Sequence, residues 1–260
     1  MIEHLIADPA ERKQRAAEKE EWVLDFLRRE IYSSTAILAV EMGIGNRAAL
    51  NVLNRMERKK LLVKDEVSFI KGRALPLWGI TSNGVLEGLS PEDVATVSLR
   101  HHRVGSVSPV TIAHTLDVQR CSQYFEIDLD CEDWTPTRLL PAQNERKGHP
   151  KRWSVYPDGV VSFPIDNENF VSVAVEVERS RKSPERYVQI IGGHLSNIKK
   201  NRYVKVYYFC ESKKVAENLE ALFLRLMVKK KIWFRLKDDD DEIPPKEVMA
   251  YFEFNGMELF

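Results

Sequence analysis

The chain has 260 residues, of which 43% are hydrophobic and 30% are charged, a composition that is ordinary for a globular protein and excludes wholesale disorder. Its 39 basic and 39 acidic residues cancel to a formal net charge of zero. Affinity for nucleic acid therefore has to come from local basic patches and not from a global field. The length suits two modest domains, each with its own core.

The cysteines and the N-terminal residues bear on the cellular compartment. Cys121, Cys131 and Cys210 form an odd, widely spaced set without a CxxC pair, which argues against a disulfide framework and against a thiolate zinc site. The N-terminal residues lack the apolar core of a signal peptide, and no stretch approaches the length that spans a bilayer. We therefore expect a protein of the reducing cytoplasm with no membrane segment.

The first part of the chain predicts three helices followed by a β-hairpin. A helix with a charged first half is expected from about Pro9 to Arg29. After a serine cap, a second helix is expected over TAILAVEMG, and a third follows a glycine-rich turn over RAALNVLNRMERKK. Two strands then flank Gly72. This order predicts a winged helix-turn-helix domain over residues 1–98.

The third helix and the hairpin tip carry side chains that suit DNA. One face of this helix is apolar, and the opposite face carries Arg47, Asn51, Arg55 and Arg58. Arginine and asparagine can pair with guanine and adenine edges in the major groove, while the basic hairpin tip suits phosphates through Lys71 and Arg73. The expected partner is double-stranded DNA. The same pattern also fits a winged helix that serves protein contacts or dimerisation.

Residues 99–260 predict a second domain with a mixed sheet. After a link, the sequence predicts a helix over SPVTIAHTLDVQRCSQYF and a strand within TRLLPAQNERKGHPKRW. A hairpin over residues 156–178 and a helix from Ser183 to about Ile198 come next. The chain then continues with the strand RYVKVYYFC, an amphipathic helix from Lys213 to Val228, and a closing strand within AYFEFNGMELF.

The hairpin, YPDGVVSFPIDNENFVSVAVEVE, organises this domain. Period-2 alternation places its valines on one face and Glu176 and Glu178 on the other. If the reversal is centred on Asn167, antiparallel pairing places Asp158 opposite Glu176. Three carboxylates would then meet, which is a good cradle for Mg²⁺ or Mn²⁺. The pattern equally fits a solvated edge hairpin with its acids on the wet face, and both interpretations stay open at this point.

The order of elements in the second domain is helix, strand, strand, strand, helix, strand (αβββαβ), and it resembles the PD-(D/E)XK restriction-endonuclease-like fold. Pro157 and Asp158 resemble its PD, and residues 176–178 occupy its (D/E)-X-K position. A winged helix, the His-Thr-Leu helix at residues 114–116, the PDG turn and the VEVE strand together resemble the replication-relaxation family. That family is similar to the MobC-type conjugative relaxases of mobilisable plasmids. The fold class expected is α/β (α+β).

The resemblance implies metal-dependent DNA nicking at a plasmid origin of transfer, with Asp158, Glu176 and Glu178 holding the ion. It also implies other mobilisation or coupling proteins as partners. Glu178 stands where the nuclease pattern has lysine, so Lys182 and Arg186 are the candidates for the missing cation.

Two mechanistic alternatives remain open at this stage. A third carboxylate at position 178 would strengthen metal binding and leave the electrostatic work to the metal. Tyr187 is a candidate covalent nucleophile, with water-mediated attack as the competing mechanism.

Proteins of other classes also fit this sequence. A non-catalytic DNA-binding regulator of plasmid replication or transcription, with a degenerate nuclease fold, predicts salt-sensitive duplex binding without cleavage and without dependence on divalent ions. An accessory protein that assists another relaxase fits the sequence as well.

Overall fold

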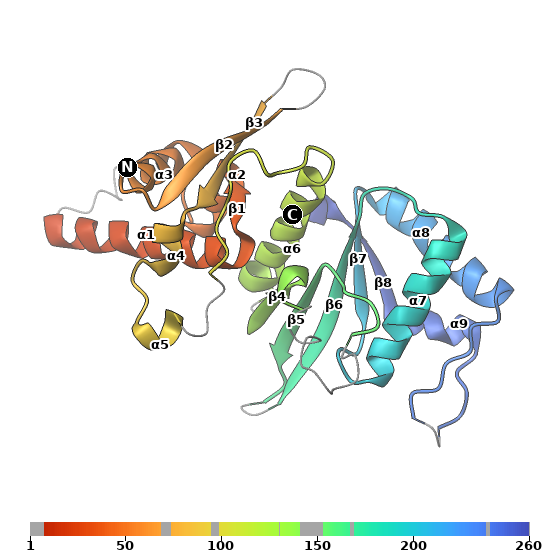
Figure 1. Ribbon diagram of the computed structural model, residues 1–260. Coiled ribbons are helices and arrows are strands. Elements are labelled where there is room, and N and C mark those ends of the chain that lie inside the picture. Colours follow the sequence, from red (N-terminus) through yellow and green to blue (C-terminus); the bar gives the residue numbers. More distant parts are fainter. Residues whose placement is uncertain are drawn as a thin grey trace, which may run out of the picture. The chain divides into compact units, whose positions relative to one another are not determined.

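The computed structural model describes residues 8–68, 74–94, 99–129, 131–140, 153–166, 169–237 and 240–259. The chain divides into two compact units, Met1–Gln119 (unit 1) and Arg120–Phe260 (unit 2). It is a mixed α/β protein with one three-stranded and one five-stranded sheet (Figure 1). In the described ranges, no single helix is long and apolar enough to cross a membrane, and only the bent pair Thr35–Glu41 and Asn46–Arg58 meets that test when both helices are taken together.

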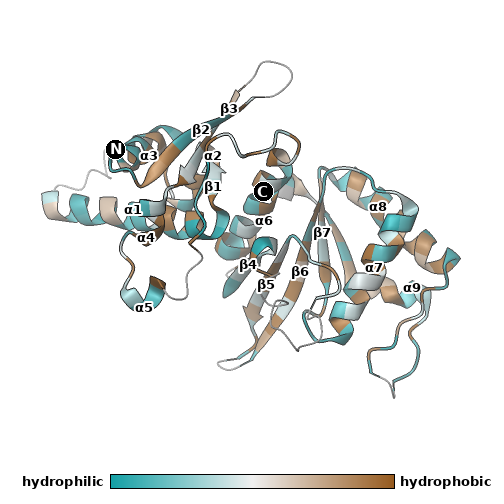
Figure 2. Ribbon diagram, in the orientation of Figure 1, coloured by the Kyte–Doolittle hydropathy of each residue, from teal (hydrophilic) through white to brown (hydrophobic). Residues whose placement is uncertain are grey.

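Unit 1 contains the helices and the hairpin that the sequence predicts. Its elements are α1 (Pro9–Glu30), β1 (Tyr32–Ser34), α2 (Thr35–Glu41), α3 (Asn46–Arg58), β2 (Leu62–Ser68), β3 (Ala74–Ile80), α4 (Ser82–Leu86) and α5 (Pro91–Val94). The three strands form an antiparallel sheet in the order β1-β3-β2. Leu27, Leu38, Leu53 and Trp78 are fully buried in the core between helices and sheet. The hydrophilic first half of α1 contributes little to this core (Figure 2).

Residues 99–119 pack onto unit 1, so the two units divide later than the expected boundary between residues 98 and 99. His102 Nε2 lies 2.7 Å from Asp65 Oδ2, and both side chains are buried. Ile112 and Leu116, on helix α6 (Ile112–Gln123), belong to the same apolar core as α1 to α3. The sequence predicts a link over residues 99–108 and a first helix of the second domain after it, but in the structure both the link and the start of α6 belong to unit 1.

Unit 2 is built on a five-stranded mixed sheet in the order β4-β5-β6-β7-β8. The strands are β4 (Asp133–Pro136), β5 (Gly159–Pro164), β6 (Phe170–Glu178), β7 (Val206–Cys210) and β8 (Phe252–Gly256). The first three run antiparallel and the last three run parallel. The central strand is therefore β6. Because neighbours flank it on both sides, the solvated edge hairpin is wrong.

The two faces of β6 meet different neighbours. Helices α7 (Pro184–Lys199) and α8 (Lys213–Lys229) cover one face (Figure 1), where Ala174 shares a core with Ile191 and Phe223. Glu176 and Glu178 alternate with the valines and so point to this covered face. The valine face is also buried, and there Phe125 packs edge-on against Phe209 with ring centroids 5.8 Å apart.

Two smaller features complete unit 2. Strand β4 precedes the range 137–153 in which the sequence predicts a strand, and residues 137–139 of that range form a 3-10 turn, while residues 141–152 lie outside the described residues. Most of the basic loop that follows lies outside the described residues. The short helix α9 (Pro245–Val248) leads into β8.

Two adjacent glycines in α7 provide a matched pair of variants. A Cβ at Gly192 would meet no atom within 4 Å, whereas a Cβ at Gly193 would lie 2.9 Å from the Cβ of Val155. Gly192→Ala should raise the free energy of unfolding by about 0.5–1 kcal/mol, because alanine loses less backbone entropy in a helix. Gly193→Ala should lower it, because the chain around Val155 has to move. Chemical denaturation tests this order, and equal stabilities would contradict the packing of Val155 on α7.

Candidate functional site

The hairpin formed by β5 and β6 has the register that the sequence predicts. Gly159 pairs with Val175, so Asp158, which directly precedes β5, falls opposite Glu176. Asp158 Oδ2 accepts a hydrogen bond of 2.8 Å from the backbone N–H of Val177. This carboxylate therefore lies against the central strand, between the positions of the two glutamates.

The PDG turn needs glycine at position 159, because Trp134 leaves no room there for a Cβ atom. A Cβ on Gly159 would lie 2.2 Å from Cη2 of Trp134, and the tryptophan ring is buried. The backbone carbonyl of Asp158 accepts a hydrogen bond of 2.9 Å from the N–H of Thr137. Because the backbone is fixed on both sides, the Asp158 carboxylate is held in one position.

Glu176 faces a buried histidine of α7. Its Oε1 lies 3.2 Å from Nε2 of His194, whose side chain is fully buried. The contact is not aligned as a hydrogen bond, and among the described residues Nε2 has no other partner. Burial lowers the pKa of His194 to about 3, although the charge of Asp158 opposes this shift. The imidazole is therefore neutral.

A chain of donors leads through this histidine toward Glu176. Asn197 Nδ2 donates to the hydroxyl of Tyr203 at 2.9 Å, and that hydroxyl lies 2.7 Å from Nδ1 of His194. Burial raises the pKa of Tyr203 above its ordinary value, so the phenol keeps its proton. Since its oxygen already accepts from Asn197, the phenol donates that proton to Nδ1. The histidine proton then resides on Nε2, the ring nitrogen nearer to the Glu176 carboxylate.

Tyr208 places a second polar atom on the same face. It pairs with Glu176 across the parallel strands β6 and β7. Its hydroxyl is buried and has no hydrogen-bond partner in the part of the chain that the structure describes. Burial raises its pKa well above the ordinary value, and the charges of Glu176 and Glu178 add to the shift. A buried hydroxyl of this kind calls for a partner such as water or a ligand oxygen.

Glu178 is paired with a cation. Lys182 Nζ lies 2.5 Å from its Oε2, and the glutamate side chain is 6% exposed. Lys182, one of the two cations that the sequence analysis selects, therefore reaches the end of β6. Arg186, the other, is exposed, and its guanidinium donates to Gln189 at 3.3 Å.

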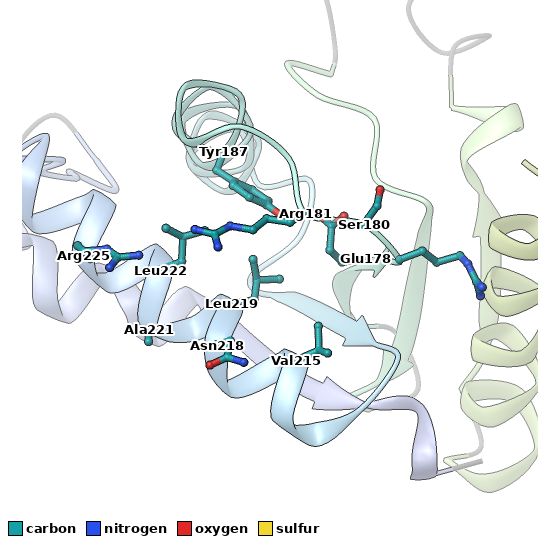
Figure 3. Close-up of a pocket in the computed structure, with 11 residues that line it drawn as sticks. Glu178, Ser180, Arg181, Tyr187, Val215, Asn218, Leu219, Ala221, Leu222 and Arg225 are labelled. Carbon is teal, nitrogen blue, oxygen red and sulfur yellow. The ribbon is translucent and has the colours of Figure 1, made fainter. Parts of the chain in front are cut away.

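Tyr187 extends from α7 toward Glu178 (Figure 3). It is fully buried, and its hydroxyl accepts a hydrogen bond of 3.1 Å from the backbone N–H of Lys182. Burial raises its pKa to about 12, and the charge of Glu178 adds to this shift. These surroundings disfavour the phenolate that a covalent nucleophile requires.

The donor set of this face can be compared with the needs of a metal ion. Among the described residues, no group of three or more His, Cys, Asp or Glu side chains is arranged to hold a metal. Mg²⁺ is commonly held by one or two carboxylates and completes its shell with water and substrate phosphates. Asp158 and Glu176, beside the unpartnered hydroxyl of Tyr208, supply hard oxygen donors that fit this type of ion.

The predicted DNA-contacting residues of α3 differ in their surroundings. Arg47 and Asn51 are exposed. Arg55 is half-buried, and its Nε lies 2.6 Å from Glu20 Oε1. Burial alone would raise the pKa of the Glu20 carboxyl. Hydrogen bonds from Lys59 and Arg55 lower this pKa by more than burial raises it, so the pKa of Glu20 lies below its ordinary value. Arg55 therefore links α3 to α1.

The remaining predicted contacts are less defined. Arg58 is exposed, and its Nε donates to the backbone carbonyl of Asn54 at 3.3 Å. Lys71 and Arg73 lie outside the described residues.

Four residues of the site are not predicted from the sequence: His194, Asn197, Tyr203 and Tyr208. A signal for two of them exists, because residues 187, 194 and 197 fall on one side of a helix whose other members are apolar. Polar side chains within such a stripe need buried partners. Tyr203 and Tyr208 are found only once β7 is paired with β6.

Comparisons with protein-family models, curated proteins and solved structures find no match to this chain.

Acidification should destabilise unit 2 through His194. Between pH 6.5 and pH 3 the unfolded chain binds a proton that the folded chain does not, so stability is full above pH 6.5 and falls below it. From this residue alone, the free energy of unfolding should fall by about 2 kcal/mol between pH 7 and pH 5. Urea titrations of wild type and His194→Gln at both pH values test this, because the variant should lack that part of the dependence. The same pH slope in both proteins would contradict the buried neutral histidine.

Proposed function

We propose that this chain is a metal-dependent DNA-nicking protein, a relaxase of the replication-relaxation type that acts at a plasmid origin of transfer. The observation that supports it most is the placement of Asp158 against the central strand, opposite Glu176, with the Glu178–Lys182 pair at the strand end. Acid, acid and lysine thus gather at one end of one hairpin, as the PD-(D/E)XK resemblance requires. Unit 2 also contains β4, β5, β6, α7 and β7 in the βββαβ order that this resemblance predicts after its first helix, whereas α6 begins in unit 1.

In this proposal Asp158 and Glu176 hold Mg²⁺ or Mn²⁺. When bound, the ion would polarise the scissile phosphate and lower the pKa of an attacking water. The hydrogen bond from Tyr203 fixes the ring of His194, whose Nε2 lies 3.2 Å from Glu176. Lys182 takes the role of the missing lysine from outside the strand, since it reaches back to Glu178.

Water is the proposed nucleophile. Tyr187 is buried, its hydroxyl accepts a backbone hydrogen bond, and its pKa is raised to about 12, largely by burial. A phenol in that state is a weak nucleophile near neutral pH. Its packing against Phe223, with ring centroids 5.5 Å apart, suits a structural role.

Unit 1 is proposed to be a winged helix that binds duplex DNA. Its three helices precede a hairpin that joins β1 in a three-stranded sheet. The third helix exposes Arg47 and Asn51 on the side opposite to its buried residues Ala49 and Leu53. Exposed arginine and asparagine on such a helix suit readout of the major groove.

Cleavage can be tested with variants that preserve shape and remove charge. Asp158→Asn can still accept from the N–H of Val177, and Glu176→Gln keeps the shape of a side chain that forms no aligned hydrogen bond with His194, so both should fold. Each should lower Mn²⁺-dependent nicking of supercoiled DNA carrying the cognate origin by more than about 100-fold, because even residues that only orient metal ligands contribute 10–100-fold. Both should also weaken Mn²⁺ binding measured by calorimetry.

Glu220→Gln is the matched control, because Glu220 is an exposed carboxylate of α8. It should nick like wild type. Undiminished nicking by Asp158→Asn or Glu176→Gln would overturn the site. Specific duplex binding with neither cleavage nor Mn²⁺ binding by the wild type would favour the non-catalytic regulator.

DNA recognition can be tested separately on α3. Arg47→Gln and Asn51→Ala should each weaken binding to the cognate duplex by about 1–3 kcal/mol, because each removes a contact to a base edge. Arg15→Gln on α1 is the control, since Arg15 is 56% exposed and lies outside α3. Fluorescence anisotropy at fixed salt measures the affinities. If all three variants bind like wild type, α3 does not read the duplex.

A further inference from the structure

A cavity of about 550 Å³ lies in unit 2 beside the candidate site. Its lining comes from the chain that leaves β6, from Tyr187 on α7 and from helix α8. Glu178 forms part of the wall, so the cavity borders the Glu178–Lys182 pair. Its volume lies within the range that is typical of small-ligand sites.

Arginines give this cavity its charge. Arg179, Arg181 and Arg225 all contribute to the lining. Figure 3 shows Arg181 extending from the loop toward Leu222 and Arg225 on α8. Within the described ranges, neither Arg181 nor Arg225 has a hydrogen bond or an ion pair, and both are exposed. Two neighbouring guanidinium groups without acidic partners are suited to an oxyanion, and phosphate is one whose oxygens match the fork of donors on arginine.

The remaining lining is not that of a simple anion site. Leu219 and Leu222 provide an apolar wall (Figure 3), while Ser180 and Asn218 add polar groups that can hydrogen-bond. A phosphate alone needs no apolar wall, but a nucleotide presents a phosphate, a flat base with an apolar face and a polar base edge. The combination of features therefore suits a nucleotide.

We propose that this cavity binds one nucleotide unit, with its phosphate on Arg181 and Arg225 and its base against Leu219 and Leu222. The proposal deepens the proposed function and rests on it for the source of the ligand, which would be an unpaired nucleotide of the strand that is cut. A base inside a duplex is stacked on both faces and cannot enter a cavity of this kind. The cavity thus selects an unpaired strand next to the acidic residues, while unit 1 would bind the duplex.

Binding of a labelled ten-nucleotide thymidine strand to the full chain tests the proposal. EDTA removes divalent ions, and an excess of unlabelled duplex occupies unit 1. The double variant Arg181→Gln/Arg225→Gln should bind the strand at least about tenfold more weakly, because each guanidinium donates charge-assisted hydrogen bonds. The slope of log affinity against log salt should also fall by about 0.7, since the contact to one phosphate is lost.

Lys214→Gln is the matched control, because this lysine lies on the same helix, is 78% exposed and does not line the cavity. It should bind like wild type. Both altered arginines are exposed, so the double variant should keep the wild-type unfolding midpoint. Equal affinities of the double variant and the control would overturn the proposal.

Competition experiments separate the sources of the ligand. Displacement of the strand by thymidine 5′-monophosphate supports a pocket for the free nucleotide as well, and displacement by unlabelled strand alone supports a pocket that requires the polymer. Equal displacement by inorganic phosphate and thymidine 5′-monophosphate would overturn the base contact. The binding assay contains no metal, so it can show strand binding that depends on the two arginines even if the nicking assay fails. Conversely, nicking that requires Glu176 can be observed even if strand binding does not depend on these arginines.

Discussion

The full or partial burial of three carboxylates at the central strand of unit 2 is the constraint on which the rest of that unit depends. A buried charge is strongly destabilising unless hydrogen bonds or an opposite charge compensate it. Asp158 accepts a hydrogen bond from the backbone N–H of Val177, and Glu178 forms an ion pair with Lys182. Glu176 lies 3.2 Å from His194. Each compensation uses a different element, so the positions of β5, α7 and the loop between β6 and α7 are all tied to the acids.

Helix α7 supplies several of the polar side chains around these carboxylates. Tyr187, His194 and Asn197 lie on its sheet-facing side among apolar residues. Asn197 accepts from the backbone N–H of Ser154 at 2.7 Å and donates to the carbonyl of Val155 at 2.9 Å. The helix therefore fixes the chain that leads to Asp158 and, through His194, also faces Glu176. One helix thus contacts both the chain that precedes Asp158 and the face of β6 that carries Glu176.

The local parts of this arrangement could be predicted from sequence, and the non-local parts could not. Alternating valines and a short polar reversal determine a hairpin register without other information, so the pairing of Asp158 with Glu176 was accessible. The position of β6 in the sheet was not, because its parallel partner β7 begins almost thirty residues later and no local pattern encodes that pairing. The burial of His102 against Asp65 escaped prediction for the same reason, and with it the division between the units. Likewise, the partners of His194 became visible only in the folded chain.

The positions of the positive charges determine where unit 2 would attract a phosphate. Lys182 lies 2.5 Å from Glu178, and a lysine so close to a carboxylate presents a nearly neutral pair to an incoming anion. A phosphate near the acids would meet repulsion from Asp158 and Glu176 unless other cations offset it. Among the described residues that line the neighbouring cavity, Arg181 and Arg225 are the cations without acidic partners. In the proposed function, attraction of a nucleic-acid strand to this region would therefore depend more on these two arginines than on Lys182.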